Sequence, residues 1–164
     1  MAEPYFLLLL AFPPLALLVF LYLLHSTSPP SQDPNQEAPR VHHGGGGSSG
    51  IGLALAHRAA AEGARVSIMA RSESKLEEAR NSIKMASGVE VAAFAADVRD
   101  YEAVKKAVDE AGPIDVLLLN HGVLVALEVE KQELSEIKFT MDVNLMGCFN
   151  MIKAALPARN EEPQ

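Results

Sequence analysis

The chain has 164 residues, enough for one domain of ordinary size, and 49% of them are hydrophobic. A formal net charge of −7 and a pI near 5.2, without a basic patch or interleaved aromatic residues, argue against a nucleic-acid partner. The single cysteine, Cys148, excludes an intramolecular disulfide framework and is typical of a reducing compartment.

Residues 1–24 are predicted to form an N-terminal membrane anchor, with the lipid bilayer as partner. The apolar run over residues 5–24 is long enough, at a helical rise of about 1.5 Å per residue, to match a hydrocarbon core of about 30 Å. A cleaved signal peptide is the alternative, but it would have a basic start, whereas this one carries Glu3 and no Lys or Arg. Arg40, the nearest basic residue, weakly favours a cytosolic domain. Between them, residues 25–40 form a Pro/Ser-rich spacer.

A glycine cluster over residues 44–52 runs directly into a helical pattern. Gly46, Gly50 and Gly52 have the spacing G-x-x-x-G-x-G, which lets a backbone approach a phosphate at the positive end of a helix. A flexible linker is the simpler alternative, but a helix and a strand follow at once. The same residues satisfy G-x-S-x-G of serine hydrolases; that interpretation is disfavoured because no firm apolar strand precedes them.

Strands and helices alternate through the rest of the chain. We expect strands at 64–70, 89–95 and 113–120, and helices from Ser72 or Ser74 to Lys84, at 101–110 and at about 135–156. The expected buried stripes are Leu76, Ala79 and Ile83, then Val104, Ala107 and Val108, then Ile137, Met141, Leu145, Phe149 and Ile152. The fold class is therefore α/β, the N-terminal half of a Rossmann-like doubly wound parallel sheet over residues 41–156. Strand 113–120 should be buried on both faces, and residues 157–164 form a polar tail.

The strand expected before the glycines conflicts with its position. It reads Arg40-Val41-His42-His43, although in this architecture it would be the central, apolar strand. The two histidines are adjacent and lack further ligands at metal-binding spacing, so no metal site is predicted. We assign them no function.

Basic residues after the second strand predict NADPH rather than NADH as cofactor. Arg71 stands twenty-one residues after Gly50, where an Arg accommodates the 2′-phosphate of NADP. Lys75 lies on the same helical face and adds a second cation. The alternative is a solvated basic pair balanced by nearby acidic residues, Glu73, Glu77 and Glu78.

Polar residues close the third and fourth strands as well. Asp97 could accept a hydrogen bond from the adenine amino group, or serve as a loop residue or helix N-cap. Asn120 and Gly122 end the fourth strand, where a glycine gives the cofactor close access to the backbone. His121 between them has no evident partner for acid–base chemistry.

From about Gly44 to Leu156 these motifs resemble the short-chain dehydrogenase/reductase family, with the fingerprint Thr-Gly-x-x-x-Gly-x-Gly. Segments 46–59, 70–72, 96–101 and 112–116 are most similar to plant 3-ketodihydrosphingosine reductases. That resemblance implies NADPH-dependent reduction of a long-chain base in sphingolipid synthesis, at the endoplasmic reticulum membrane with the domain facing the cytosol. An anchored steroid or retinoid reductase and a non-catalytic truncated nucleotide-binding product are the alternatives, and a homo-oligomer stays open.

The resemblance also assigns site residues. Asn144 would support the catalytic tyrosine and lysine through a water molecule. The sequence stops at Gln164, before the family's catalytic serine and Tyr-x-x-x-Lys, so the chain alone is expected to be inactive; Tyr101 and Lys105 have that spacing but on the adenine side. The predicted cofactor-binding residues are Gly46, Ser48, Ser49, Gly50, Ile51, Arg71, Lys75, Asp97, Asn120 and Gly122.

Overall fold

The structure, a computed structural model, describes residues 38–159. The predicted anchor over residues 1–24 lies outside the described residues, as do nearly all of the predicted spacer and residues 160–164. Within the part that is described, no helix combines the length and the apolar character that a bilayer crossing requires.

Four parallel strands form one sheet in the order β3-β2-β1-β4. They are β1 (Arg40–His43), β2 (Arg65–Ala70), β3 (Ala92–Ala95) and β4 (Val116–Leu118). Each connection between consecutive strands contains a helix, as parallel pairing demands. The predicted Rossmann-like parallel α/β sheet is confirmed.

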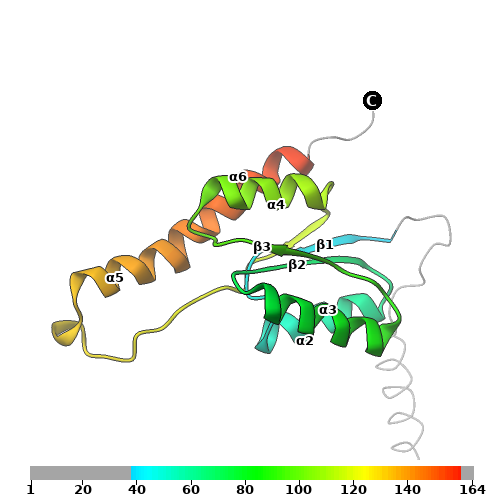
Figure 1. The fold of residues 1–164 in the computed structure, drawn as a ribbon. Coiled ribbons are helices and arrows are strands. Elements are labelled where there is room, and N and C mark those ends of the chain that lie inside the picture. Colours follow the sequence, from blue (N-terminus) through cyan, green and yellow to red (C-terminus); the bar gives the residue numbers. More distant parts are fainter. Residues whose placement is uncertain (1–37, 160–164) are drawn as a thin grey trace, which may run out of the picture. The chain divides into compact units, whose positions relative to one another are not determined.

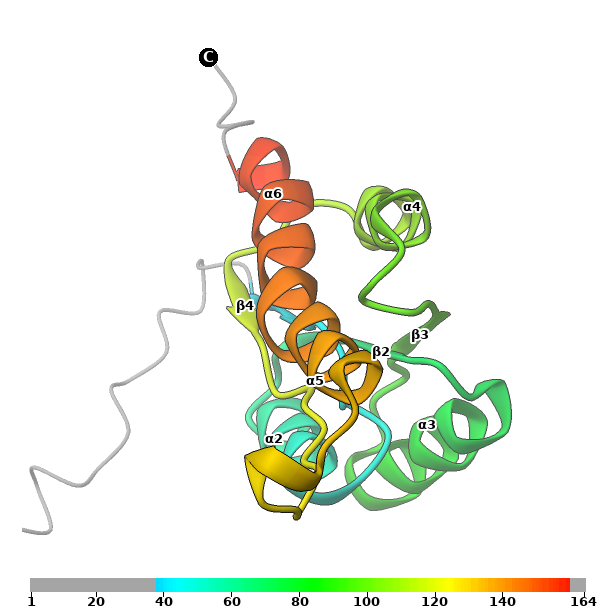
Figure 2. The same cartoon turned by 90° about the vertical axis from the view of Figure 1, so that its left-hand side faces the viewer.

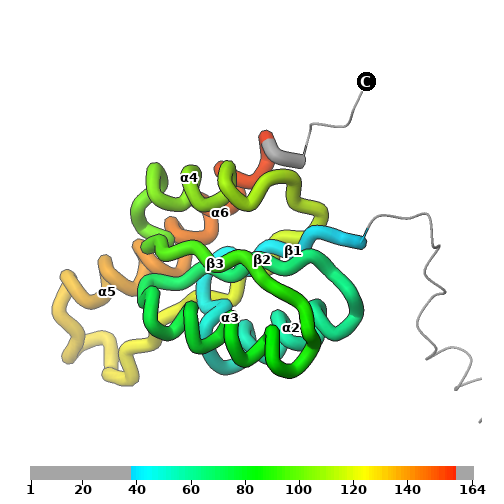
Figure 3. The backbone as a smooth tube through the Cα atoms, turned by 45° about the vertical axis from the view of Figure 1, so that its right-hand side comes forward, coloured from blue at the N-terminus to red at the C-terminus, as the bar shows by residue number. Residues whose placement is uncertain are grey.

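Helices cover both faces of the sheet, as Figures 1 and 3 show. On one face lie α2 (Gly50–Ala61) and α3 (Glu73–Ser87), and on the other α4 (Tyr101–Ala111) and α6 (Gly147–Arg159). The 3₁₀ turn η1 (Val129–Lys131) precedes α5 (Leu134–Met141), and the π-helical segment η2 (Asp142–Met146) joins α5 to α6. Figure 2 shows α5 and α6 as one long column. This column continues through Pro157 to Arg159, three residues past the predicted domain end.

Helix caps fix where α3 and α4 begin. The Ser72 hydroxyl accepts a hydrogen bond from the backbone N–H of Lys75 at 3.4 Å, so Ser72 rather than Ser74 starts α3. The Asp100 carboxylate accepts from the backbone N–H groups of Glu102 and Ala103 at the start of α4. Ser72 lies two residues after the end of β2 and Asp100 five after the end of β3, so Arg71 and Asp97 lie in the connecting loops.

The predicted stripe on the last helix is wrong. Met141, Leu145, Phe149 and Ile152 are 49%, 44%, 57% and 40% exposed. The buried face consists instead of Val143, Gly147, Met151, Ala154 and Ala155. Small residues occupy it because the helix approaches closely: a Cβ added at Gly147 would lie 2.7 Å from a methyl of Val98. Met151 is the large side chain that this face buries, whereas Leu145, Phe149 and Ile152 remain on the outer face.

Strand β4 is shorter and more exposed than predicted. It covers Val116–Leu118 rather than residues 113–120, and the Val116 side chain is 41% exposed. Within residues 38–159, β4 pairs only with β1 and is therefore an edge of the sheet. The expectation of burial on both faces is thus wrong for the described part of the chain.

The polar strand β1 forms nonetheless and occupies the centre of the sheet. Its backbone pairs with β2 and β4, which needs no particular side chain. His42 and His43 point to opposite faces and are 1% and 0% exposed. His42 Nδ1 lies 2.5 Å from the Ser67 hydroxyl, whereas His42 Nε2 and both ring nitrogens of His43 have no hydrogen-bond partner within the described residues. The conflict seen in the sequence persists as buried polar atoms in the core.

Candidate functional site

A cleft of about 900 Å³ opens at the carboxyl ends of the four strands. Loops that follow β1, β2, β3 and β4 all contribute to its wall, as expected where parallel strands end together. The structure brings every predicted cofactor-binding residue to this cleft: Gly46, Ser48, Ser49, Gly50, Ile51, Arg71, Lys75, Asp97, Asn120 and Gly122. Their contact with a cofactor stays a prediction.

Two glycines allow the loop after β1 to pack tightly. Gly46 has a φ of +72°, and a Cβ there would lie 2.6 Å from the carbonyl oxygen of Asn120. A Cβ on Gly52 would collide with the carbonyl oxygen of Gly46. Around Gly50, by contrast, nothing lies within 4 Å of the added atom. The glycines thus shape the loop at two positions and leave open space at the third.

The start of α2 suits an anion. The side chain of Ser49, which precedes the helix, makes no capping hydrogen bond, and the first turn holds no acidic residue. The first N–H groups of a helix have no partner within the helix, and they carry its positive partial charge. With the open space at Gly50, this arrangement fits the pyrophosphate of a dinucleotide.

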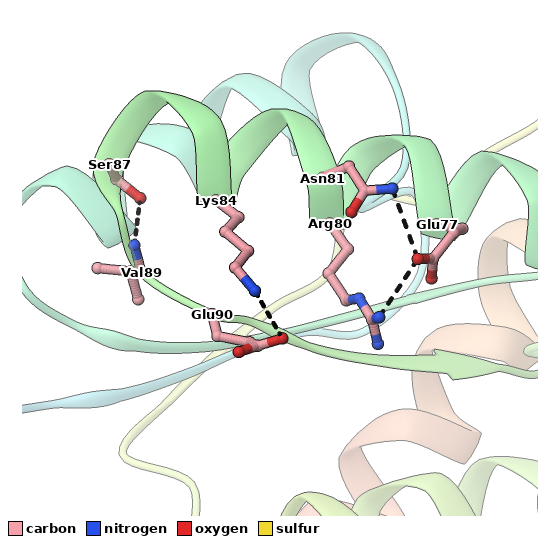
Figure 4. A network of polar contacts seen from close by, with 7 residues as sticks. All are labelled: Glu77, Arg80, Asn81, Lys84, Ser87, Val89 and Glu90. Carbon is pink, nitrogen blue, oxygen red and sulfur yellow. Dashed lines mark hydrogen bonds and ion pairs between the residues drawn. The ribbon is translucent and has the colours of Figure 1, made fainter.

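Arg71 and Lys75 line the same cleft, where the charge of Arg71 also acts on Asp97. Both residues are exposed, and neither side chain makes a hydrogen bond or ion pair within residues 38–159. Figure 4 shows that the Glu77 carboxylate accepts from Arg80 and Asn81 instead, at 3.2 and 3.5 Å. Lys84, in the last turn of the same helix, pairs with Glu90, which follows the helix, at 3.3 Å. The acidic residues of α3 therefore do not balance Arg71 and Lys75, which favours the phosphate-binding interpretation.

Asp97 does not cap a helix, because Asp100 performs that role. Its carboxylate lines the cleft and is held by the guanidinium of Arg99, with Nη2 2.6 Å from Oδ2. These hydrogen bonds hold the pKa of Asp97 below its ordinary value, so the group is an anionic acceptor at neutral pH.

His121 joins the glycine loop to the last helix column. Its Nδ1 lies 2.8 Å from the carbonyl oxygen of Gly44, and its Nε2 lies 3.6 Å from the Cys148 sulfur. Both ring nitrogens thus face partners that hold the loop and α6 together. His121 lines the cleft, as do Val98, Val123 and Val143, none of which the sequence identified as binding residues.

Asn144 lies in η2 and outside the set of cleft-lining residues. Its amide oxygen accepts from the backbone N–H of Val123 and its amide nitrogen donates to the carbonyl of Val123, both at 2.8 Å. This pair fixes the segment after Gly122 to the helix column. Support of a catalytic tyrosine and lysine by Asn144 stays a prediction.

Tyr101 is also absent from the cleft wall. It opens α4, and the ammonium of Lys153 in α6 lies 5.1 Å from the centre of its ring. Tyr101 and Lys105 therefore match the spacing of the catalytic motif without lining the cleft, as their position in the sequence suggested.

Known proteins are similar to much of this chain in sequence. The chain is 72% identical over 113 residues to 3-dehydrosphinganine reductase TSC10A of Arabidopsis thaliana, which covers 69% of this chain and 35% of that protein. Identity to TSC10B of the same plant is 69%, over 69% of this chain and 34% of that protein. The chain thus spans about a third of the length of these relatives.

A solved structure shares the fold. L-Sorbose reductase of Gluconobacter frateurii, complexed with NADPH and L-sorbose, is similar with a TM-score of 0.68 and 30% identity, over 74% of this chain and 48% of that one. The profile of the family described as short chain dehydrogenase matches residues 45–163. The chain therefore belongs to the short chain dehydrogenase family.

Proposed function

We propose that this chain is the nucleotide-binding part of a reductase that uses NADPH to convert 3-ketodihydrosphingosine to dihydrosphingosine. The observation that carries the proposal is the 72% identity to a plant 3-dehydrosphinganine reductase over 113 residues. Arg71 and Lys75, whose side chains make no hydrogen bond or ion pair within residues 38–159, support NADPH in particular. The NADPH-complexed sorbose reductase supports a nicotinamide cofactor for this fold.

In this proposal, several residues of the cleft bind defined parts of the cofactor. The N-terminus of α2 and the open space at Gly50 receive the pyrophosphate, while Arg71 and Lys75 bind the 2′-phosphate. Asp97 accepts from the adenine amino group. Bound NADPH supplies a hydride to the keto carbon of the substrate.

The proton for the developing alkoxide would come from the family's catalytic tyrosine. Among residues 38–159 no tyrosine lines the cleft, so we expect the 164-residue chain to bind NADPH without turning over ketosphinganine. A full-length relative assayed in parallel is the positive control. Substantial turnover by this chain alone would contradict the expectation.

Titration of the chain with NADPH and NADH tests the cofactor. NADPH should bind roughly ten- to a hundredfold more tightly, because charge-assisted pairs to the 2′-phosphate contribute about 1.5–3 kcal/mol. Arg71→Ala should remove most of this preference. Arg80→Ala, on the following helix α3, is the matched control, since its partner Glu77 lies outside the cleft. Equal affinities in the unaltered chain would contradict the assignment.

We propose further that residues 5–24 anchor the chain in the endoplasmic reticulum membrane, with the domain in the cytosol. The apolar length of that segment supports an anchor, and a cytosolic domain would meet both NADPH and a membrane-embedded long-chain base. Alkaline carbonate extraction of microsomes should leave the chain in the membrane pellet. Protease should remove a C-terminal tag from sealed microsomes, and a protected tag would place the domain in the lumen.

A further inference from the structure

Arg99 does not line the cleft, yet it makes more hydrogen bonds to Asp97 than any other residue. Its Nε lies 3.0 Å from Oδ1 and 3.1 Å from Oδ2, and its Nη2 lies 2.6 Å from Oδ2. The backbone N–H of Arg99 adds a bond to Oδ1 at 3.0 Å. The carboxylate is therefore clamped from one side by a single residue two positions along the chain.

Arg99 does not occupy every acceptor site of the Asp97 carboxylate. A carboxylate offers about four lone-pair sites. Three N–H groups of Arg99 approach them: the backbone N–H, Nε–H, which is shared between both oxygens, and Nη2–H. About one acceptor site remains, and its direction is fixed by the planar fork of the guanidinium.

Arg99 is itself held in place by the last helix column. The centre of its guanidinium lies 4.9 Å from the centre of the Phe139 ring in α5. Asp142, at the start of η2, adds an attractive charge. The fork is thus fixed between the end of β3 and α5, and it can fix Asp97 in turn.

The pair contributes little to stability. The Arg99 and Asp97 side chains are 42% and 27% exposed, and ion pairs at such sites are weak because water screens them. Its geometry, with both carboxylate oxygens engaged at the rim of a nucleotide-sized cleft, accounts better for its presence.

We propose that Arg99 is a positioning residue that turns the free acceptor site of Asp97 toward the 6-amino group of the adenine ring. This inference rests on the proposed NADPH function. It makes Arg99 a determinant of base recognition, although the residue touches no part of the nucleotide.

The test compares NADPH with its hypoxanthine analogue, in which a carbonyl oxygen replaces the 6-amino group. The unaltered chain should bind NADPH about tenfold or more tightly than the analogue, because the analogue cannot donate to Asp97 and places an oxygen against it. Arg99→Met should reduce this ratio several-fold by weakening NADPH more than the analogue. Arg99→Lys, which keeps the charge without the fork, should also reduce it.

Arg80→Met is the matched control, because it removes an exposed arginine–carboxylate pair on α3, and it should leave the ratio unchanged. Circular dichroism of every variant verifies that it is folded. An equal loss of affinity for both nucleotides in Arg99→Met would mean a merely structural role and would overturn the inference. A chain that binds NADPH and its analogue equally well would also overturn it while leaving NADPH binding intact. A chain that binds neither would refute the cofactor proposal and the inference together.

Discussion

The two faces of the sheet are closed to different degrees. On the α2–α3 face the predicted stripe Leu76, Ala79 and Ile83 is 3%, 2% and 0% exposed. On the other face α4 is buried in the same way, but the helix column α5–η2–α6 buries Met151 and leaves Leu145, Phe149 and Ile152 partly exposed. Apolar periodicity thus predicted that each helix exists, but it misassigned the face that the last helix buries.

The difference lies in how closely each helix approaches. A helix at ordinary distance fills the space above the sheet with Leu and Ile, as α3 does. At Gly147 the last helix approaches Val98 and His121 so closely that no side chain fits there. The outer face of the column, with Leu145, Phe149 and Ile152, is then available to further protein, since these residues are 40–57% exposed within the described part of the chain.

Truncating matched isoleucines on the two faces tests this comparison most strongly. Ile83→Ala should lower the free energy of unfolding by about 2–5 kcal/mol, because it leaves a cavity in a closed core. Ile152→Ala should lower it by less than about 1 kcal/mol, because that side chain is 40% exposed. Urea unfolding of the chain followed by circular dichroism measures both. Equal losses, with a midpoint that depends on protein concentration, would show that a second copy covers the outer face.

The buried histidines of β1 predict a loss of stability in acid. Burial lowers the pKa of His42 from 6.5 to about 4, with a smaller contribution from the charge of His43, and burial lowers the pKa of His43 also. The folded chain keeps His42 neutral, whereas the unfolded chain protonates it near 6.5, so unfolding takes up protons between these values. The free energy of unfolding should therefore be constant above pH 7 and fall by on the order of 3 kcal/mol toward pH 4.

The double variant His42→Val, His43→Val removes the titrating groups. It should flatten this slope and raise stability at neutral pH by about 1–3 kcal/mol, because three buried ring nitrogens lack partners among the described residues. Urea midpoints at half-unit steps of pH provide the measurement. An unchanged slope in the double variant would assign the acid sensitivity to other groups.

The single variants His42→Val and His43→Val test the two faces of the sheet separately. His43 lies beside Ile68 and Leu118 and faces α2, whereas His42 lies beside Ser67 and Leu117 and faces the other layer. Only His42 has a side-chain partner, the hydroxyl of Ser67. His43→Val should therefore stabilise more than His42→Val.

The candidate site was more predictable from the sequence than the packing around it. Arg71, Asp97 and Asn120 each follow a strand, and parallel strands place their carboxyl ends at one edge. Chain order therefore suffices to bring them together. The roles of Arg99 and His121 depend on contacts with Phe139 and Gly44, which lie forty and seventy-seven residues away and leave no local pattern.

Strand β1 is a part of the fold that the sequence predicted poorly. Its residues gave no apolar signal, yet it forms because β2 and β4 supply backbone partners on both sides. The backbone pairing of a central strand outweighs a poor side-chain pattern. The four residues of β1 alone could not predict this, because the pairing depends on β2 and β4.

The smallest expected effects are the changes in stability when Gly52 or Gly122 is replaced by alanine. Gly52→Ala should destabilise by about 1–3 kcal/mol, since its Cβ would collide with the backbone carbonyl of Gly46, which cannot move without opening the loop. Gly122→Ala places its Cβ 3.6 Å from the amide oxygen of Asn144, an ordinary contact, and should change stability by less than about 0.5 kcal/mol. Urea unfolding and NADPH titration of both variants compare the tightly packed loop before α2 with the open segment after β4. If Gly122→Ala cost as much as Gly52→Ala, the segment after β4 would be as closely packed as the loop before α2.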